Sequence, residues 1–222
     1  MMKSKGLFVI LAVVLPLGSS QASIPPSLEV SISVYDYAHV SSKTLAKAEQ
    51  EARRVFQQAG IETVWITCFP KPEKIEPPHG CSLVDATHLM LEIIPHGLTA
   101  RDRKRNGMLG TALLNEKGAS YYAYAFLDHI QMLERSLGFP LLGDVLAHEI
   151  GHLLLGPNAH SARGIMSAHW HNTELRNVSE GFMYFLPEQS RLMRERLRSH
   201  RLESPPVSAT AVSPGYAGMW CW

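Results

Sequence analysis

The amino-acid sequence predicts an α+β fold built around a mixed β-sheet. Near the start, an alternating apolar strand, an amphipathic helix and a second strand follow one another, which is the order of a parallel β-α-β unit. Further along, two apolar runs flank a short turn-forming segment, as in an antiparallel hairpin. Three further segments with helical periodicity follow the hairpin. Together these three observations indicate a sheet with both parallel and antiparallel strands, packed against helices.

Strands are predicted where apolar residues alternate with polar ones or form short runs rich in Val, Ile and Trp. By this criterion the first three strands cover residues 28–35, 61–67 and 87–94. A hairpin follows, because residues 107–114 and 119–126 flank Asn115-Glu116-Lys117-Gly118, a segment with the composition of a turn. The hairpin would add antiparallel pairing to an otherwise parallel sheet.

Helices are predicted where apolar residues recur every three or four positions. These segments cover residues 43–59, 130–137, 141–155 and 187–201. Ser41 and Ser42 supply an N-cap for the first helix, and Gly60 ends it. Gly156 and Pro157 end the third helix, because glycine can adopt the left-handed conformation and proline cannot continue a helix.

The composition is that of an ordinary globular protein. The chain has 222 residues, of which 45% are hydrophobic and 18% are charged, and its formal net charge is +1. Disorder throughout the chain is therefore excluded. A charge this close to zero gives no reason to expect nucleic acid or an anionic membrane as a partner. We expect one domain over residues 23–203.

The N-terminus has the pattern of a secretory signal peptide. Lys3 and Lys5 precede an apolar run over residues 6–17, and small residues lead to Ala22. The alternative is a membrane anchor, but a run of about 12 apolar residues is too short to span ~30 Å of hydrocarbon. We therefore expect residues 1–22 to be removed and the mature protein, free of the membrane, to be secreted or periplasmic.

Export would permit disulfide bonds. Cys68 and Cys81 bracket a Pro-rich segment and are predicted to form one bridge. Their use as zinc ligands is the weaker alternative, because neither belongs to a C-x-x-C pair. Cys221 is left over as a free thiol or an intermolecular bridge. It lies within residues 204–222, a Pro/Ser/Ala-rich stretch that we expect to be a flexible tail.

The most informative motif is H-E-x-x-H, present as His148-Glu149-Ile150-Gly151-His152 within the predicted 141–155 helix. Residues four apart share one helix face, so two imidazoles can bind the same Zn²⁺. Glu149 is rotated away from the pair and can reach a water molecule beside the metal. Random order of these residues would give about 0.04 such matches in a chain of this composition.

A third histidine, His160, follows shortly after the helix. Structural zinc sites usually have four protein ligands, whereas three ligands and an open position are typical of catalytic sites. The other side of the helix carries Leu146, Ile150 and Leu153, which we expect to be buried. The histidine face would then line a cleft.

The segment HEIGHLLLGPNAHSARGIMSAHW resembles the active-site region of the metzincin zinc peptidases, which have H-E-x-x-H-x-x-G-x-x-H followed by a Met-turn. Gly164-Ile165-Met166 resembles the Met-turn. The middle departs from the family pattern, because Gly156 lies one position later and His160 two positions later than the family's Gly and last His. An exported, bacterial-like member is what the resemblance suggests.

The resemblance implies a twisted mixed sheet with a hairpin edge, an active-site helix, a Met-turn and a C-terminal helix. It also implies that His148, His152 and His160 hold Zn²⁺ and that Met166 lies beneath the metal. Glu149 would act as general base in the hydrolysis of peptide bonds. The protein would thus be a zinc-dependent endopeptidase acting on proteins or peptides.

The same resemblance implies that residues 107–114 form the edge strand that binds an extended substrate by β-augmentation. The candidate substrate-binding residues in this strand are Gly110, Thr111 and Ala112.

Alternative interpretations remain open at this point. The third ligand could be Glu174 or Glu180, as in a gluzincin-like peptidase. The zinc site could also serve an exported binding module without turnover, or the histidines could be incidental in a metal-free interaction domain. The presence of Glu149 argues against a purely structural site, because such a site needs no base.

Four further residues have both a functional and a structural interpretation. Asp144 could accept a hydrogen bond from His148 or simply be an acidic residue in the first turn of its helix. His169 and His171 could touch substrate or be exposed loop residues. Tyr184 could stabilise an oxyanion or belong to a packed segment.

Overall fold

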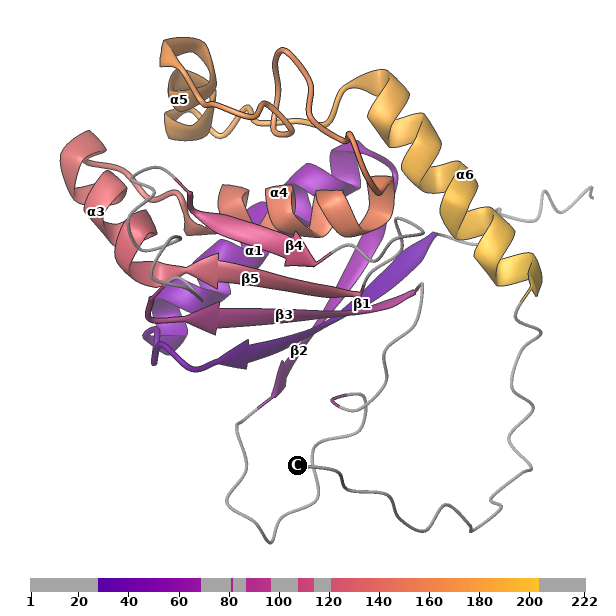
Figure 1. The fold of residues 1–222 in the computed structure, drawn as a ribbon, viewed down its shortest axis with the longest axis horizontal. Coiled ribbons are helices and arrows are strands. Elements are labelled where there is room, and N and C mark those ends of the chain that lie inside the picture. Colours follow the sequence, from indigo (N-terminus) through magenta and orange to yellow (C-terminus); the bar gives the residue numbers. More distant parts are fainter. Residues whose placement is uncertain (1–27, 69–80, 82–86, 97–107, 114–120, 204–222) are drawn as a thin grey trace, which may run out of the picture.

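A computed structural model describes residues 28–68, 81, 87–96, 108–113 and 121–203. These residues form an α+β structure in which helices lie over one face of a twisted five-stranded sheet (Figure 1). The predicted fold class is confirmed. The predicted signal peptide and tail, Cys221 and the 115–118 turn lie outside the described residues. Within the described residues, we find no helix with the length and apolar character needed to cross a membrane.

The sheet has the strand order β2-β1-β3-β5-β4. The strands are β1 (Glu29–Asp36), β2 (Glu62–Cys68), β3 (His88–Ile94), β4 (Gly110–Leu113) and β5 (Tyr122–Phe126). Strand β1 pairs in parallel with β2 and β3, and β3 pairs in parallel with β5, whereas β4 is antiparallel to β5. The parallel unit and the antiparallel edge therefore follow the prediction, and β4 is one edge of the sheet.

The helices are α1 (Ser42–Gln58), α3 (Leu127–Leu137), α4 (Leu142–Leu155), α5 (Asn172–Ser179) and α6 (Pro187–Glu203). Helix α3 starts earlier than predicted, directly after β5. Helix α5 was not predicted as a separate helix, because it is short and polar and buries only Glu174 and Val178. Such a segment carries almost no apolar periodicity.

Helix α1 shows how local sequence sets the ends of an element. The Ser41 hydroxyl accepts a hydrogen bond from the Thr44 backbone N–H at 3.2 Å, which caps the first turn. The predicted apolar face is buried. Gly60 adopts a φ of +75° just after the helix, a conformation that favours glycine.

Helix α4 lies on the sheet beside α1, near the centre of the domain. It contacts α1 and α6 on the helical side and β3, β4 and β5 on the sheet side. Leu146 and Ile150 are fully buried, and Leu153 is 8% exposed, as predicted for this side of the helix. The core thus buries this side of α4, and the histidine face is left for the cleft.

The N-terminal end of α4 receives its cap from another helix. Leu141, its N-cap residue, has no side-chain cap of its own. Instead, Glu134 of α3 accepts hydrogen bonds at Oε1 from the backbone N–H groups of Leu141 at 2.7 Å and Leu142 at 3.1 Å. A carboxylate at this end also complements the helix dipole.

The predicted Cys68–Cys81 disulfide is present, with a Cα–Cα distance of 5.7 Å. The Tyr35 hydroxyl donates a hydrogen bond to the Cys81 carbonyl at 2.5 Å. This contact ties the bridge to β1, next to the end of β2.

Candidate metal centre

Helix α4 places the two histidines of the H-E-x-x-H motif on one face. The ring centroids of His148 and His152 are 4.8 Å apart, and their Nε2 atoms are 3.1 Å apart. Both rings are half-buried. The close approach of two ring nitrogens, both of which can act as ligands, indicates a site that is shaped to share one cation.

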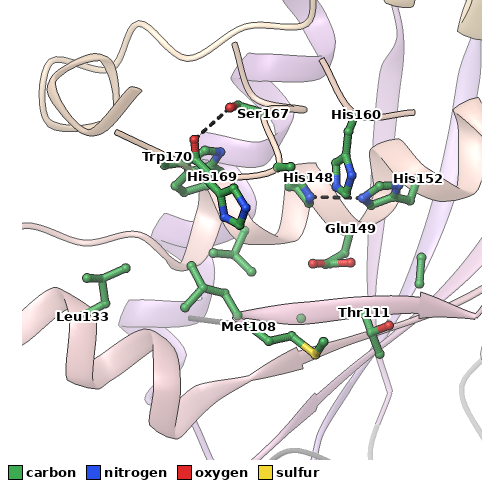
Figure 2. A pocket seen from close by; sticks show the side chains of 15 residues that line it. Met108, Thr111, Leu133, His148, Glu149, His152, His160, Ser167, His169 and Trp170 are labelled. Atoms are coloured by element: carbon green, nitrogen blue, oxygen red, sulfur yellow. Dashed lines mark hydrogen bonds between the residues drawn. The ribbon is translucent and has the colours of Figure 1, made fainter. Parts of the chain in front are cut away.

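His160 joins this pair from the segment after the helix. Its ring centroid is 4.7 Å from that of His152 and 5.6 Å from that of His148. One ring nitrogen from each of the three residues lies within 4.8 Å of the others, and no other such His, Cys, Asp or Glu group occurs in the part of the chain that the structure describes. Figure 2 shows the three imidazoles turned toward one another beside Glu149.

The chain reverses direction between α4 and His160. Gly156 has φ +72° and ψ −159°, so the expectation of a left-handed conformation there is wrong. This extended conformation is open essentially to glycine alone and points the chain out of the helix. Asn158 then adopts a φ of +59°, and the segment returns to bring His160 beside His152. Two unusual backbone positions thus accomplish the turn.

The donor set fits a zinc ion. Two nitrogens bound tetrahedrally at 2.0–2.1 Å lie about 3.4 Å apart. The 3.1 Å between the Nε2 atoms of His148 and His152 is close to this separation. Three neutral imidazoles suit Zn²⁺, and a fourth position would face the cleft.

A backbone carbonyl orients His148. Its Nδ1 is 2.6 Å from the carbonyl oxygen of Ile165, which can only accept a hydrogen bond. Nδ1 therefore carries the proton, and Nε2 presents its lone pair to the other histidines. The indole Nε1 of Trp170 donates to the same oxygen at 3.2 Å. Asp144 is not the partner of His148, so that interpretation is wrong.

Burial keeps the imidazoles neutral. It lowers the pKa of His148 to about 4 and, together with the neighbouring histidines, lowers that of His152 to about 3. Burial and the nearby His169 also lower the pKa of His160. Neutral imidazole is the form that binds a metal, so the site does not first have to lose protons at neutral pH.

Glu149 is buried between α4 and strand β4. Its side chain is 5% exposed, and burial raises its pKa to about 8. A Cβ atom built on Gly110 would lie 2.6 Å from the Glu149 Oε1 atom. Only glycine at this position of β4 leaves room for the carboxylate.

A tight turn lies against α4 where the Met-turn was predicted. Ser167 N–H donates to the Gly164 carbonyl at 3.0 Å, and Gly164 has a φ of +77°. Met166 is fully buried, and a Cβ on Gly151 of α4 would lie 2.6 Å from its sulfur. The turn therefore packs directly against the helix, and its Ile165 carbonyl reaches His148.

The histidines open onto a cleft of about 920 Å³. One wall is formed by β4 and the residues before it, including Gly110, Thr111 and Ala112, and the other by α4 and residues 167–170. Leu133 of α3 contributes to the apolar lining. Figure 2 shows Met108, Thr111 and Leu133 across the cleft from His148 and Trp170. The edge strand β4 and the three histidines thus line the same cleft.

The remaining candidates lie outside the three-histidine group. Glu174 is buried and accepts a hydrogen bond from the His171 backbone N–H at 3.3 Å, while Glu180 is exposed at the end of α5. Tyr184 is not among the residues that line the cleft, and its carbonyl accepts from Ile165 N–H at 2.9 Å. His169 does line the cleft.

Sequence reasoning did not find every residue of the site. Trp170 and Met108 line the cleft, and Trp170 also shares the carbonyl that orients His148. The structural role of Gly110 was not recognised either. The sequence signal for Trp170 was weak, namely an aromatic residue just after the predicted Met-turn.

Solved structures with a distant likeness to the chain include the following two. The chain is similar to archaemetzincin from Methanopyrus kandleri, with 13% identity over 79% of this chain and 99% of that chain and a TM-score of 0.47. It is also similar to a zinc-dependent peptidase from Methanocorpusculum labreanum, with 17% identity over 75% and 99% of the two chains and a TM-score of 0.44. No family model and no curated protein matches the chain.

Proposed function

We propose that this protein is a zinc-dependent endopeptidase of metzincin type. The observation that carries the proposal is the convergence of His148, His152 and His160 beside the buried carboxylate of Glu149, at the wall of an open cleft. A purely structural zinc site needs neither the carboxylate nor the cleft.

In this proposal, the three histidines bind the metal and Glu149 transfers the proton. His148, His152 and His160 would hold the metal, and Zn²⁺, when bound, would acidify a water molecule and polarise a carbonyl oxygen. Glu149 is not part of the three-histidine group, and its carboxylate lies against Gly110. Glu149, whose ionised form a bound cation would favour despite its burial, would instead take a proton from the attacking water molecule and pass it to the leaving amine.

Strand β4 is the proposed substrate-binding edge. It pairs with β5 on one side, and Gly110, Thr111 and Ala112 face the cleft. An extended peptide lying along this strand would run past Glu149 and the three histidines. The substrate is therefore proposed to be a protein or peptide in extended conformation.

We also propose that the protein is exported, with residues 1–22 removed. The Cys68–Cys81 disulfide supports this proposal, because such bonds persist mainly in oxidising compartments.

The test combines metal analysis with the variant Glu149→Gln. The purified protein should bind about one Zn²⁺ per chain and cleave members of a peptide library. Because glutamine keeps the shape of the side chain but cannot accept the proton, the variant should retain zinc and lose at least about 10²-fold in cleavage rate.

Three outcomes would contradict the proposal. Cleavage by Glu149→Gln at the parent rate would show that Glu149 is not the base. Zinc binding without cleavage of any library peptide would favour the non-catalytic binding module, and absence of zinc binding would favour the metal-free interaction domain.

A further inference from the structure

The segment that carries His160 is not stabilised by regular secondary structure of its own. Seven residues separate His152 from His160, and the stretch from Gly156 to His160 contains no helix or strand. Gly156 and Asn158 both adopt positive φ values there. His160 itself is exposed, unlike the two histidines on α4. Its position must therefore be maintained by contacts from other parts of the chain.

Hydrogen bonds hold the backbone on both sides of His160. After it, Ser161 N–H donates to the Met166 carbonyl at 2.9 Å. Before it, the carbonyl of Ala159 accepts from Nε2 of Gln189 at 3.1 Å. Gln189 is the third residue of α6, far from this loop in sequence.

The same Gln189 side chain also caps its own helix. Leu186 N–H donates to its Oε1 at 3.0 Å, which is the contact made by the third residue in a capping box. The two partners fix the amide orientation, because Leu186 N–H can only donate and the Ala159 carbonyl can only accept. Glutamate could form the capping contact but could not donate to Ala159.

Helix α6 is itself anchored to α4, the helix that carries the other two histidines. Met193 and Leu197 of α6 are buried, and Arg196 Nη1 donates to the Leu154 carbonyl of α4 at 3.2 Å. Gln189 thus links the His160 segment, through α6, to the helix that carries His148 and His152.

We propose that Gln189 is a positioning residue for metal binding, which holds His160 at the distance that the other two histidines require. The inference rests on the proposed zinc site. Residues that orient a metal ligand through a hydrogen bond typically change metal affinity by 10–100-fold when they are replaced. Gln189 acts one residue away from the ligand, so we expect an effect near the lower end of this range.

The test compares Gln189→Glu with Gln189→Met in the full chain. Zn²⁺ affinity is measured by competition with a chromophoric chelator, and thermal unfolding is measured on the metal-free protein. Gln189→Glu keeps the cap of α6 and removes the donor to Ala159, so we expect about tenfold weaker zinc binding with only a small decrease in the unfolding temperature. Gln189→Met loses both contacts and should weaken binding similarly while lowering the unfolding temperature further.

A neighbouring residue provides the matched control. Glu188→Gln makes the reverse exchange at an exposed position whose carboxylate pairs with Arg191, and it should leave zinc affinity unchanged. The charge that Gln189→Glu adds would by itself attract a cation, so direct electrostatic repulsion of Zn²⁺ cannot explain weaker binding. The absorption of bound Co²⁺ gives a second readout, because release of His160 should weaken the tetrahedral bands.

The possible outcomes separate this inference from the proposed function. If the parent protein binds no Zn²⁺, the proposed function fails. If the parent binds Zn²⁺ and Gln189→Glu binds it within twofold of the parent affinity, the positioning role of Gln189 is wrong while the metal site stands.

Discussion

At the scale of single residues, the site depends on a close approach between α4 and β4. The Glu149 carboxylate fits against the backbone of Gly110, and a Cβ there would lie 2.5 Å from the Tyr124 carbonyl as well as 2.6 Å from Glu149 Oε1. The Tyr124 atom belongs to the backbone of the neighbouring strand and cannot move aside easily. Gly110 is therefore required by packing at the site rather than by a turn.

Gly110→Ala should displace Glu149 and strain the edge of the sheet. We expect a loss of about 1–3 kcal/mol in the free energy of unfolding, the range typical of overpacking, and at least tenfold slower peptide cleavage. Thermal unfolding and cleavage assays measure the two effects. Leu113→Ala, an exposed change in the same strand, is the control and should alter cleavage little. Unchanged cleavage by Gly110→Ala would show that Glu149 tolerates displacement.

At the scale of elements, the α1–α4 interface contains a buried carboxylate. Asp144 of α4 is 3% exposed. Burial, followed by the nearby Glu51 and opposed by Arg54, raises the pKa of Asp144 to about 7. A carboxyl group with a raised pKa in the folded state binds protons more tightly there than in the unfolded chain. The contribution of Asp144 to the free energy of unfolding is therefore largest below about pH 4 and is lost as the pH rises toward 7.

Asp144→Asn removes this titration while it keeps the shape of the side chain. The variant should have a free energy of unfolding about 1–3 kcal/mol above that of the parent at pH 8, and the difference should disappear near pH 4. Denaturant unfolding at both pH values measures it. Glu180→Gln, at an exposed carboxylate, should change little at either pH. A parent more stable than Asp144→Asn at pH 8 would mean that Arg54 compensates the buried charge.

Elements also differed in how well the sequence predicted them. Helices α1 and α4 were predicted almost to the residue, because their caps and apolar periodicity are encoded within the segment itself. Helix α5 was missed, because it has only two buried residues and is held mainly by its own capping contacts. The N-terminal cap of α4 could not be predicted, since Glu134 belongs to another helix.

At the scale of the whole molecule, the disulfide and the candidate metal site lie at opposite edges of the sheet. Cys68 ends β2, one edge strand, whereas the cleft is lined by β4, the other edge. Stability and metal binding should therefore be separable. The bridge closes a loop with a sequence separation of 13 residues.

Replacing both Cys68 and Cys81 by Ser should lower the free energy of unfolding by about 3 kcal/mol, as the chain-entropy model gives for a loop of this size. Zinc affinity should stay within twofold of the parent, because the bridge is remote from the histidines. Thermal unfolding and chelator competition measure both quantities, with Cys221→Ser as the control for loss of a thiol. A large loss of zinc affinity in the double variant would show that the two edges of the sheet are coupled.

The sequence by itself determined the parts of this protein that depend on neighbours along the chain. The alternating strands, the caps of α1 and the two histidines one turn apart on α4 all follow from spacing within a few residues. The pairing of Cys68 with Cys81 was likewise accessible, because the two cysteines bracket one loop. Only the tertiary structure decided which residues meet from distant segments. It brought His160 rather than Glu174 beside the pair, placed Gly110 against Glu149, and set Gln189 behind the loop that carries His160. These contacts arise from the packing of α4 against β4 and α6, and packing between elements leaves no periodic signal in a single sequence.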